Sequence, residues 1–231
     1  MVDEHKILDR FSKTALAIDL VLITSENNEL KVLLTKRTVE PYKNAHSLPG
    51  SLIDYKSDLH KSAQNMVDSF TKENTYYLKE FNSFNSLDRH PNGRVVTTAF
   101  LVLTSSENLK PHLLPDLVKI DELPTLAFDH KEIIDQCFDH FADRARYYPL
   151  IFYVLPELFT SSELRTAYEQ LYRTTLDVRN FSKKFKQSKL IVPTELKKSF
   201  MVVGGRRARL HKFDRKNYQN RQKPKINLDF E

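Results

Sequence analysis

A chain of 231 residues, 40% of them hydrophobic, is long enough for one large domain or two small ones with a packed core. Its charged N-terminus lacks the layout of a secretory signal, and no apolar run approaches the roughly 20 residues of a membrane span. A single cysteine, Cys137, excludes an internal disulfide and suits a reducing compartment, so the sequence predicts a cytoplasmic protein.

The net charge of +6 is unevenly distributed along the chain. Residues 151–231 carry 18 Lys and Arg against 8 Asp and Glu, whereas residues 1–150 carry 18 against 22. This asymmetry points to a basic half that binds a partner, with nucleic acid as the leading candidate. A solvated basic surface without a partner is the alternative.

The first 145 residues mix predicted strands with predicted helices. Residues 14–23, 31–37 and 94–105 are rich in β-branched and aliphatic types and predict strands. The apolar spacing within residues 57–72 and 129–147 predicts two amphipathic helices. Such a mixture is typical of an α/β or α+β domain.

Two helix starts carry the spacing of a capping box. Asp129 stands three residues before Glu132, and Thr160 stands three residues before Glu163. The second pair opens a helix through residue 172, and Asp177 then predicts the N-cap of another helix.

A glycine pair near the C-terminus predicts a β-hairpin. Gly204 and Gly205 separate two strand-like runs, "FMVV" and "RRARLHKF", and a glycine pair suits a tight hairpin turn. Two helices followed by a hairpin resemble a winged helix-turn-helix. The tail from Asp214 is polar, and we expect it to be loosely ordered.

The predicted second helix of this unit, "VRNFSKKFKQ", separates apolar from basic side chains. On a helical wheel Val178, Phe181 and Phe185 form one apolar seam. A helix in the DNA major groove needs cations that pair with phosphates and a few groups that read bases, and its N-terminal end reaches the bases. The opposite face offers Arg179, Asn180, Lys183, Lys184 and Lys186, none of them acidic.

Duplex DNA is therefore the predicted partner of the C-terminal region. RNA is the alternative, although no exposed pair of aromatic side chains for base stacking is evident. A solvated basic helix is the second alternative. The predicted DNA-binding residues are Thr160, Ser161, Arg179, Asn180, Lys183, Lys184, Arg206, Arg207 and Arg209.

Residues 50–71 follow the outline of a Nudix box without most of its acids. Aligned on Gly50, the first Glu of the family pattern falls at Lys56 and the Arg-Glu pair at Gln64 and Asn65. The aliphatic position is Met66, and the later positions fall at Asp68, Ser69 and Thr71.

Motifs beyond the box carry a wider resemblance. They are "VLLTKR", "SLPGSLI", "DRHPNGRVVTTAF", "LPTLAFDHKEII" and "LFTSSELRTAYEQLYRTTLDVRNFSKKFKQSKLI". In this order the chain resembles the Nudix-related transcriptional regulators of the NrtR-like group, over nearly its whole length.

The resemblance implies an α+β fold: an α/β/α Nudix sandwich with a mixed sheet, followed by a winged helix-turn-helix. The expected bounds are residues 1–148 for the effector-binding domain, 149–215 for the DNA-binding domain and 216–231 for a basic tail. It also implies a homodimeric repressor on a palindromic operator. The effector would be ADP-ribose or another nucleotide, or a sugar such as arabinose in some relatives.

The altered box predicts binding without hydrolysis. Metal-assisted attack on a pyrophosphate needs several oxygen ligands and a base, but the matched positions offer Asp68 alone, and Lys56 would repel a cation. We therefore expect no catalytic residue, no metal and no cofactor, and an effector held by Arg37, Lys56 and Arg89. Two alternatives stay open: a hydrolase with relocated ligands such as Asp54 and Asp58, and a non-specific nucleic-acid-binding module.

Overall fold

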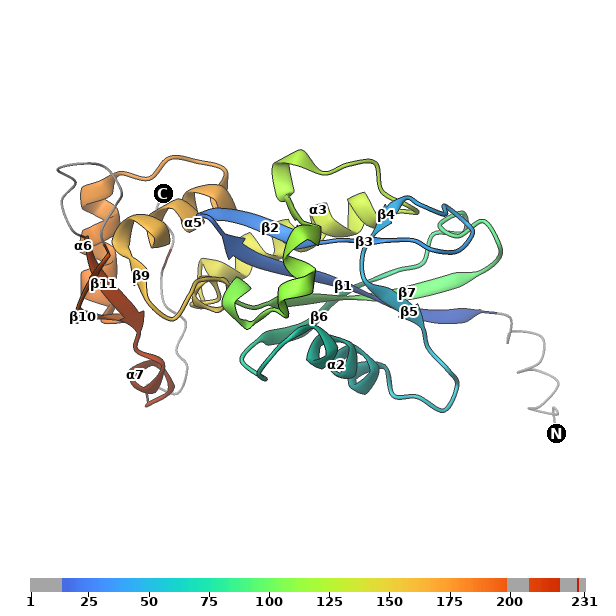
Figure 1. The fold of residues 1–231 in the computed structure, drawn as a ribbon, viewed down its shortest axis with the longest axis horizontal. Helices are drawn as coiled ribbons and strands as arrows, with labels where there is room; N and C mark the ends of the chain where they lie inside the picture. Colours follow the sequence, from blue (N-terminus) through green and yellow to red (C-terminus); the bar gives the residue numbers. More distant parts are fainter. Residues whose placement is uncertain (1–13, 199–207, 221–227, 229–231) are drawn as a thin grey trace, which may run out of the picture.

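The computed structural model describes residues 14–198, 208–220 and 228, and all structural statements concern this part of the chain. A sheet with a helix on each side forms the N-terminal domain, and a smaller helical unit with a β-hairpin adjoins one end of it (Figure 1). No helix in the described ranges is long and apolar enough to cross a membrane.

A mixed six-stranded sheet forms the centre of the N-terminal domain. Its long strand β1 pairs in parallel with β7 and antiparallel with β2 and β5, so β1 lies in the middle of the sheet. The strand order is β6, β7, β1, β2, β8, with β5 beside β1. The bounds are β1 (Ala15–Glu26), β2 (Glu29–Leu33), β5 (Gly50–Leu52), β6 (Tyr77–Phe84), β7 (Val95–Leu103) and β8 (Leu117–Lys119).

Alternation along β1 explains why both faces of this sheet are covered. Leu20 and its even-numbered neighbours pack against α2 (Leu59–Phe70), and Val21 and Ile23 pack against α3 (His130–Ala145). Successive strand side chains point to opposite faces, so a strand that is apolar throughout needs cover on both. Figure 1 shows α2 and α3 on opposite sides of β1.

Shorter elements complete this domain. A two-stranded sheet joins β3 (Thr35–Lys36) to β4 (His46–Ser47). Three 3₁₀ helices flank β8: η1 (Ser106–Asn108), η2 (Pro111–Asp116) and η3 (Ile120–Glu122).

The C-terminal domain has the winged helix arrangement expected from the sequence. Three strands pair in the order β10, β11, β9 beside helices α5 and α6. The bounds are α4 (Ile151–Val154), β9 (Phe159–Thr160), α5 (Ser161–Tyr172), α6 (Val178–Ser188), β10 (Ile191–Lys198), β11 (Ala208–Phe213) and α7 (Arg215–Asn220).

One hydrophobic core connects the two domains. Buried residues of β1, β2 and α3 join those of α4, α5 and α6 in a single cluster. At the same junction the Gln170 side chain of α5 accepts from the Leu30 amide (2.7 Å) and donates to the Asn28 carbonyl (2.6 Å). The turn between β1 and β2 is therefore fixed to the C-terminal domain by both apolar packing and hydrogen bonds.

The structure confirms the Thr160–Glu163 capping box and corrects the one expected at Asp129. Thr160 accepts from the Glu163 amide, and the Glu163 carboxylate accepts from the Thr160 amide. Asp129 is the N-cap of α3 but makes no side-chain cap hydrogen bond, because Arg89 binds its carboxylate.

Other differences from the sequence prediction lie in the C-terminal domain. Val178 was expected in the apolar seam of α6 but is 57% exposed, whereas Phe181 and Phe185 are each 2% exposed. Residues 215–220, at the start of the tail that was expected to be loosely ordered, form α7. The predicted strand-like run at residues 200–203 lies outside the described residues, and the strand that pairs with β11 is β10.

Candidate nucleic-acid interface and effector site

The α6 helix presents a basic face to solvent because its two phenylalanines anchor the other side. Phe181 and Phe185 pack on Tyr168 of α5, with ring centroids 6.0 and 5.5 Å away. Asp177 caps the helix by accepting from the Asn180 amide at 2.8 Å. The side chains of Arg179, Asn180, Lys183 and Lys186 are exposed, and Lys184 is half-buried.

The C-terminal hairpin lies beside this helix. A hollow of about 630 Å³ separates α6 from β10 and β11, and basic side chains from both elements line it. Burial, followed by the charge of Arg209, lowers the pKa of His211 below its ordinary value, so this imidazole is neutral at pH 7. The charged side chains of the lining are Lys186, Lys189, Arg209 and Asp214, so cations outnumber the one carboxylate.

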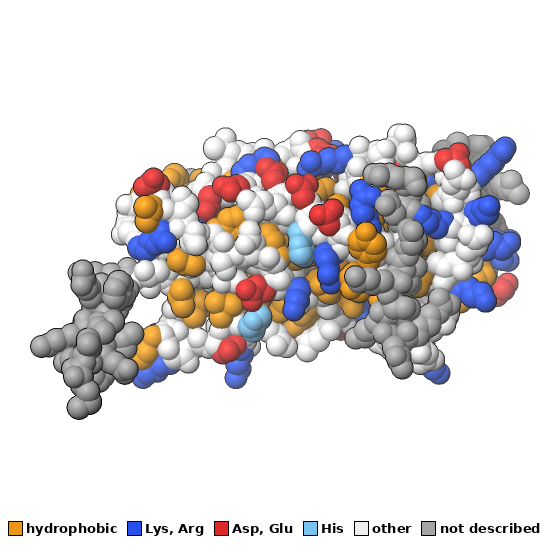
Figure 2. Space-filling view, turned by 180° about the vertical axis from the view of Figure 1, so that it is seen from behind, with side chains coloured by type: hydrophobic (Ala, Val, Ile, Leu, Met, Phe, Trp, Pro, Cys, Tyr) orange, Lys and Arg blue, Asp and Glu red, His pale blue; other side chains and the backbone are white. Residues whose placement is uncertain are grey.

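A basic helix face with a flanking basic hairpin has the geometry of a DNA-reading surface. A recognition helix enters the major groove while neighbouring elements contact the sugar-phosphate backbone. In Figure 2, which shows the molecule from behind, the C-terminal domain lies at the right, and Lys and Arg outnumber Asp and Glu at this end. Of the predicted contacts, Arg179, Asn180 and Lys183 are exposed on α6, and Arg209 of β11 lines the hollow beside this helix.

Not every predicted contact belongs to this surface. Thr160 is 1% exposed and its hydroxyl caps α5, so it is not placed to meet a phosphate. Ser161 is exposed and lines the hollow. The predicted contacts Arg206 and Arg207, and the hairpin turn predicted at Gly204 and Gly205, lie outside the described residues.

An ion pair links two elements of this C-terminal domain. Lys198 of β10 lies 2.5 Å from the Glu163 carboxylate of α5 and ties the hairpin to the helical pair. Burial would raise the pKa of Glu163, but the hydrogen bonds from Lys198 and Thr160 lower it below its ordinary value. The hairpin is thus held against α5 by a charged group that stays ionised at neutral pH.

A buried polar network lies at the start of α3 in the N-terminal domain. Arg89 donates two parallel hydrogen bonds to Asp129, Nε to Oδ2 at 2.9 Å and Nη2 to Oδ1 at 2.8 Å. Its Nη2 also lies 3.6 Å from Asp19 of β1. His130 accepts from the Leu48 amide through Nδ1 (2.9 Å) and points Nε2 toward Asp19 (3.6 Å).

The Asp19 carboxylate also explains one residue of the box. A Cβ atom at Gly50 would lie 2.4 Å from the Asp19 carboxylate and 2.5 Å from the Ile18 carbonyl. Only glycine leaves room for this approach of β5 to β1, which is a packing requirement independent of any ligand.

An aromatic cluster with a cation covers this network. Phe128 has the Arg37 guanidinium 4.7 Å from its ring centroid and the His90 ring stacked at 5.0 Å. Tyr42 meets the Phe128 ring edge-on at 4.9 Å. We call Arg37, Tyr42, His90 and Phe128 the aromatic cluster; of these four, only Arg37 was predicted from the sequence as an effector contact.

Backbone strain marks the same cluster. Tyr42 and Phe128 have φ values of 63° and 54°, and Asn44 has 69°. Bulky residues in the left-handed region are uncommon and gather at ligand sites, where the surrounding structure holds them. The sequence contains the two motifs "DRH" and "FDH" but does not show that they are close together. Only the fold brings their loops into contact.

Burial lowers the pKa of both histidines in this region. Burial, then the nearby Arg89 and Arg37, lowers the pKa of His90. Burial also lowers the pKa of His130, although Asp19 and Asp129 oppose the shift. The region therefore offers arginine charge and aromatic surface together, which suits an anionic ligand with a ring.

The predicted effector residues divide between two places. Arg37 and Arg89 lie around the aromatic cluster and the network, but the Arg89 fork is already occupied by Asp129. Lys56 lies in the exposed loop between β5 and α2, with its ammonium 5.2 Å from the Tyr55 ring centroid. Asp54 caps this turn by accepting from the Lys56 amide at 2.9 Å.

The remaining box acid is also engaged. Asp68, near the end of α2, accepts from the Tyr76 hydroxyl at 2.5 Å. Burial and this hydrogen bond raise the pKa of Tyr76 to about 12. No group of three or more His, Cys, Asp or Glu suited to a metal ion occurs within residues 14–198, 208–220 and 228.

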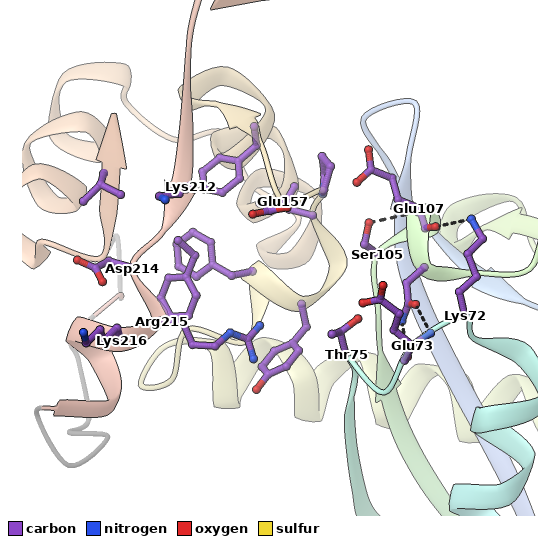
Figure 3. Close-up of a pocket in the computed structure, with 18 residues that line it drawn as sticks. Lys72, Glu73, Thr75, Ser105, Glu107, Glu157, Lys212, Asp214, Arg215 and Lys216 are labelled. Atoms are coloured by element: carbon purple, nitrogen blue, oxygen red, sulfur yellow. Dashed lines mark hydrogen bonds between the residues drawn. The ribbon is translucent and has the colours of Figure 1, made fainter. Parts of the chain in front are cut away.

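A cleft separates the two domains on the side of α7. It measures about 920 Å³ and has a stacked aromatic pair, Phe152 and Phe213, in its wall. Figure 3 shows Glu73 and Glu107 on the N-terminal side, facing Lys212, Arg215 and Lys216 across the opening. The cleft lies against the shared core, so it adjoins the contact between the domains.

Comparison with known proteins identifies the C-terminal domain. Residues 151–213 match the family of NrtR DNA-binding winged helix domains. The chain carries an NrtR-type winged helix. This match includes α6 and the hairpin, the two elements that line the basic hollow.

The NrtR-like character extends over most of the chain. The ADPR responsive transcriptional repressor NtrR of Acinetobacter baylyi is 27% identical over 215 residues, which are 88% of this chain and 83% of that relative. Shewanella oneidensis NrtR crystallised with a 27mer DNA is 26% identical with a TM-score of 0.74, covering 86% of this chain and 93% of that one.

The N-terminal half of this NrtR-like chain has a Nudix fold. A MutT/nudix family protein from Enterococcus faecalis has a TM-score of 0.65 at 22% identity, covering 93% of this chain and 94% of that one. The expected fold, a mixed-sheet Nudix domain followed by a winged helix, is thereby confirmed.

Proposed function

We propose that this chain is a transcriptional repressor whose winged helix binds operator DNA and whose Nudix domain binds an ADP-ribose-like effector. The observation that carries the proposal is the α6 helix: two phenylalanines are buried on one side, and a basic face without an acidic residue is exposed on the other. The similarity to an ADPR-responsive repressor and to an NrtR seen with DNA supports the same function.

The aromatic cluster is the proposed effector site. Its guanidinium and rings could hold a diphosphate and a base, and Lys56 would add a cation from the β5–α2 loop. In this arrangement Arg89 orders Asp129 and Asp19 behind the site instead of contacting the phosphate. Arg37 remains the contact expected from the sequence.

Two copies of the chain would bind one operator. Two-fold DNA sites match two-fold proteins, so we propose a homodimer with one winged helix on each half-site. The effector would release DNA by favouring a different arrangement of the two winged helices, since a ligand shifts only an equilibrium whose states it binds unequally.

The Nudix domain would act as a sensor without turnover. Support comes from Lys56, which stands at a position where the family pattern has an acid, and from Asp68, whose carboxylate is bound by Tyr76. A second candidate, hydrolysis of ADP-ribose, is favoured by 28% identity over 130 residues to the ADP-ribose pyrophosphatase of Methanocaldococcus jannaschii.

One set of measurements separates these functions. The full chain is used to select binding sites from a random duplex library, and the selected DNA is titrated with and without ADP-ribose. Selection of a two-fold sequence, released by ADP-ribose, supports the repressor. Release of ribose phosphate and AMP from ADP-ribose with Mg²⁺ would instead support the hydrolase.

A further inference from the structure

Val178 is an exposed apolar residue at the start of the basic helix. Of the eleven residues of α6, it alone is both apolar and exposed, at 57% of its surface. The structure gives it no place in the core, because Phe181 and Phe185 fill the contact with α5. Its exposure therefore has no packing explanation.

The position of Val178 directs it toward bound DNA. It follows the N-cap Asp177, and the first turn of a recognition helix is the part that reaches base edges in the major groove. Arg179 is its neighbour, and Ser182 lies one turn further on the same side, where it lines the hollow beside the hairpin. On the helical wheel Val178 lies between the buried Phe185 and the exposed Ser182, so it stands at the edge where the apolar seam meets groups that can contact DNA.

The major groove offers one apolar feature to such a side chain. Base edges there display hydrogen-bond donors and acceptors, except for the 5-methyl group of thymine. A valine in the first helical turn cannot form a hydrogen bond with any base. It can bury its methyl groups against that of thymine.

We propose that Val178 is a specificity-determining residue that selects thymine in each half-site through its 5-methyl group. This inference rests on the proposed DNA-binding function and adds one element of the sequence that the operator must contain. Because the contact is apolar, it is independent of the phosphate contacts made by the lysines and arginines. Salt should therefore weaken overall binding without changing the preference for thymine.

The test uses duplexes selected by the full chain from a random library. Each thymine of a selected half-site is replaced in turn by uracil, which removes only the methyl group and keeps every hydrogen-bonding group. Affinities are measured for the wild type, for Val178→Ala and for Leu196→Ala. Leu196 lies on β10 with 56% exposure and serves as the matched apolar control.

We expect uracil at one thymine to weaken wild-type binding about fourfold, the loss typical of one buried methylene-sized group. Val178→Ala should bind the thymine duplex about fourfold more weakly than wild type and lose nothing further with uracil. Leu196→Ala should keep the full response to uracil. Alanine favours a helix more than valine, so the variant should remain folded, which its melting temperature would verify.

Each other outcome overturns the inference. If replacing thymine by uracil weakens DNA binding of the wild type and of Val178→Ala equally at every position, Val178 does not read the methyl group. The repressor proposal would still stand. If no half-site retains a thymine, the contact does not exist. If the library yields no enriched sequence at all, both this inference and sequence-specific DNA binding are wrong.

Discussion

Arg89 and Asp129 form a two-bond ion pair at the start of α3. Their atoms meet at 2.8 and 2.9 Å, and the side chains are only 4% and 15% exposed. Both residues come from loops, forty positions apart in the sequence. The pair therefore joins the loop before β7 to the helix that covers the sheet.

Removing Arg89 should destabilise the fold. Arg89→Ala leaves Asp129 and Asp19 buried without their cation, which typically costs about 3–5 kcal/mol. Arg89→Lys should recover only part of the loss, because an ammonium cannot make the paired contact. Denaturant unfolding would measure the loss of unfolding free energy in these variants, with Arg94→Ala, at a less buried arginine, as the control. A loss below about 1 kcal/mol would mean that the pair is not structurally important.

The buried His130 should make stability depend on pH. Its folded pKa is lowered by burial from the ordinary value of 6.5, so the unfolded state binds protons first as the pH falls. Stability should thus be highest above pH 6.5 and should fall on acidification through and below that value. Protonation of Nδ1 would also break the hydrogen bond from Leu48.

The variant His130→Asn tests this assignment, because its amide oxygen can accept from Leu48 but does not titrate in this range. Unfolding free energies of both proteins between pH 7.5 and 5.5 would be compared. We expect a smaller loss of stability on acidification in the variant. Other histidines, including His90 with its own lowered pKa, should leave some pH dependence of stability in both proteins. Identical slopes would assign the pH dependence to those groups.

The effector proposal predicts different effects at two cations. Arg37→Ala should weaken ADP-ribose binding by about 1.5–3 kcal/mol, the usual range for hydrogen bonds to charged groups. Lys56→Glu should also weaken it, through repulsion between the new carboxylate and the diphosphate. Calorimetry would report both, with Lys79→Glu on β6 as the charge-matched control. Equal affinity of Lys56→Glu and wild type would remove Lys56 from the site.

The proposed DNA-binding surface predicts two kinds of defect in DNA binding. Arg179→Ala and Asn180→Ala should weaken binding to the selected sequence by about 1–3 kcal/mol each and relax its sequence preference. Arg209→Ala on the hairpin should weaken all duplexes alike and reduce the salt slope by about one. Gel shifts at several salt concentrations on selected and scrambled DNA would separate them. Wild-type affinity of both helix variants would contradict the helix assignment.

The spacing of residues along the sequence correctly predicted features that depend on residues within one helical turn of each other. Phe181 and Phe185 are one helical turn apart and are buried as expected, and the Thr160–Glu163 capping box formed because both partners lie within one turn. Asp129 shows the limit of such reasoning. Its spacing to Glu132 was correct for a capping box, but Arg89 competed for the carboxylate through the tertiary fold.

The missed features depend on contacts distant in sequence. Strand β6 is half polar, without strict alternation of polar and apolar residues, and is held by pairing with β7. Strand β10 contains Pro193 at an irregular pairing position. Tyr42 and Phe128 meet only because separate loops converge. A helical wheel placed Val178 beside the apolar seam but could not show that its side chain is 57% exposed.

The last prediction concerns the contact between the domains at Gln170. Its amide group binds the turn between β1 and β2, where Asn27 and Asn28 both have positive φ. Strand β1 also carries Asp19 of the polar network, so one strand connects the effector region to the winged helix. Gln170→Ala would leave the Leu30 amide and the Asn28 carbonyl without their partner.

We expect Gln170→Ala to speed hydrogen exchange at the Leu30 amide by at least about tenfold, since two hydrogen bonds contribute roughly 1–3 kcal/mol. Exchange at Leu101, in the middle of β7, should not change, and Gln187→Ala on the exposed face of α6 should affect neither. If this contact transmits the effector signal, the variant should still bind DNA and ADP-ribose separately but lose part of their mutual antagonism. Unchanged exchange at Leu30 would show that packing of the shared core holds the domains together without the Gln170 hydrogen bonds.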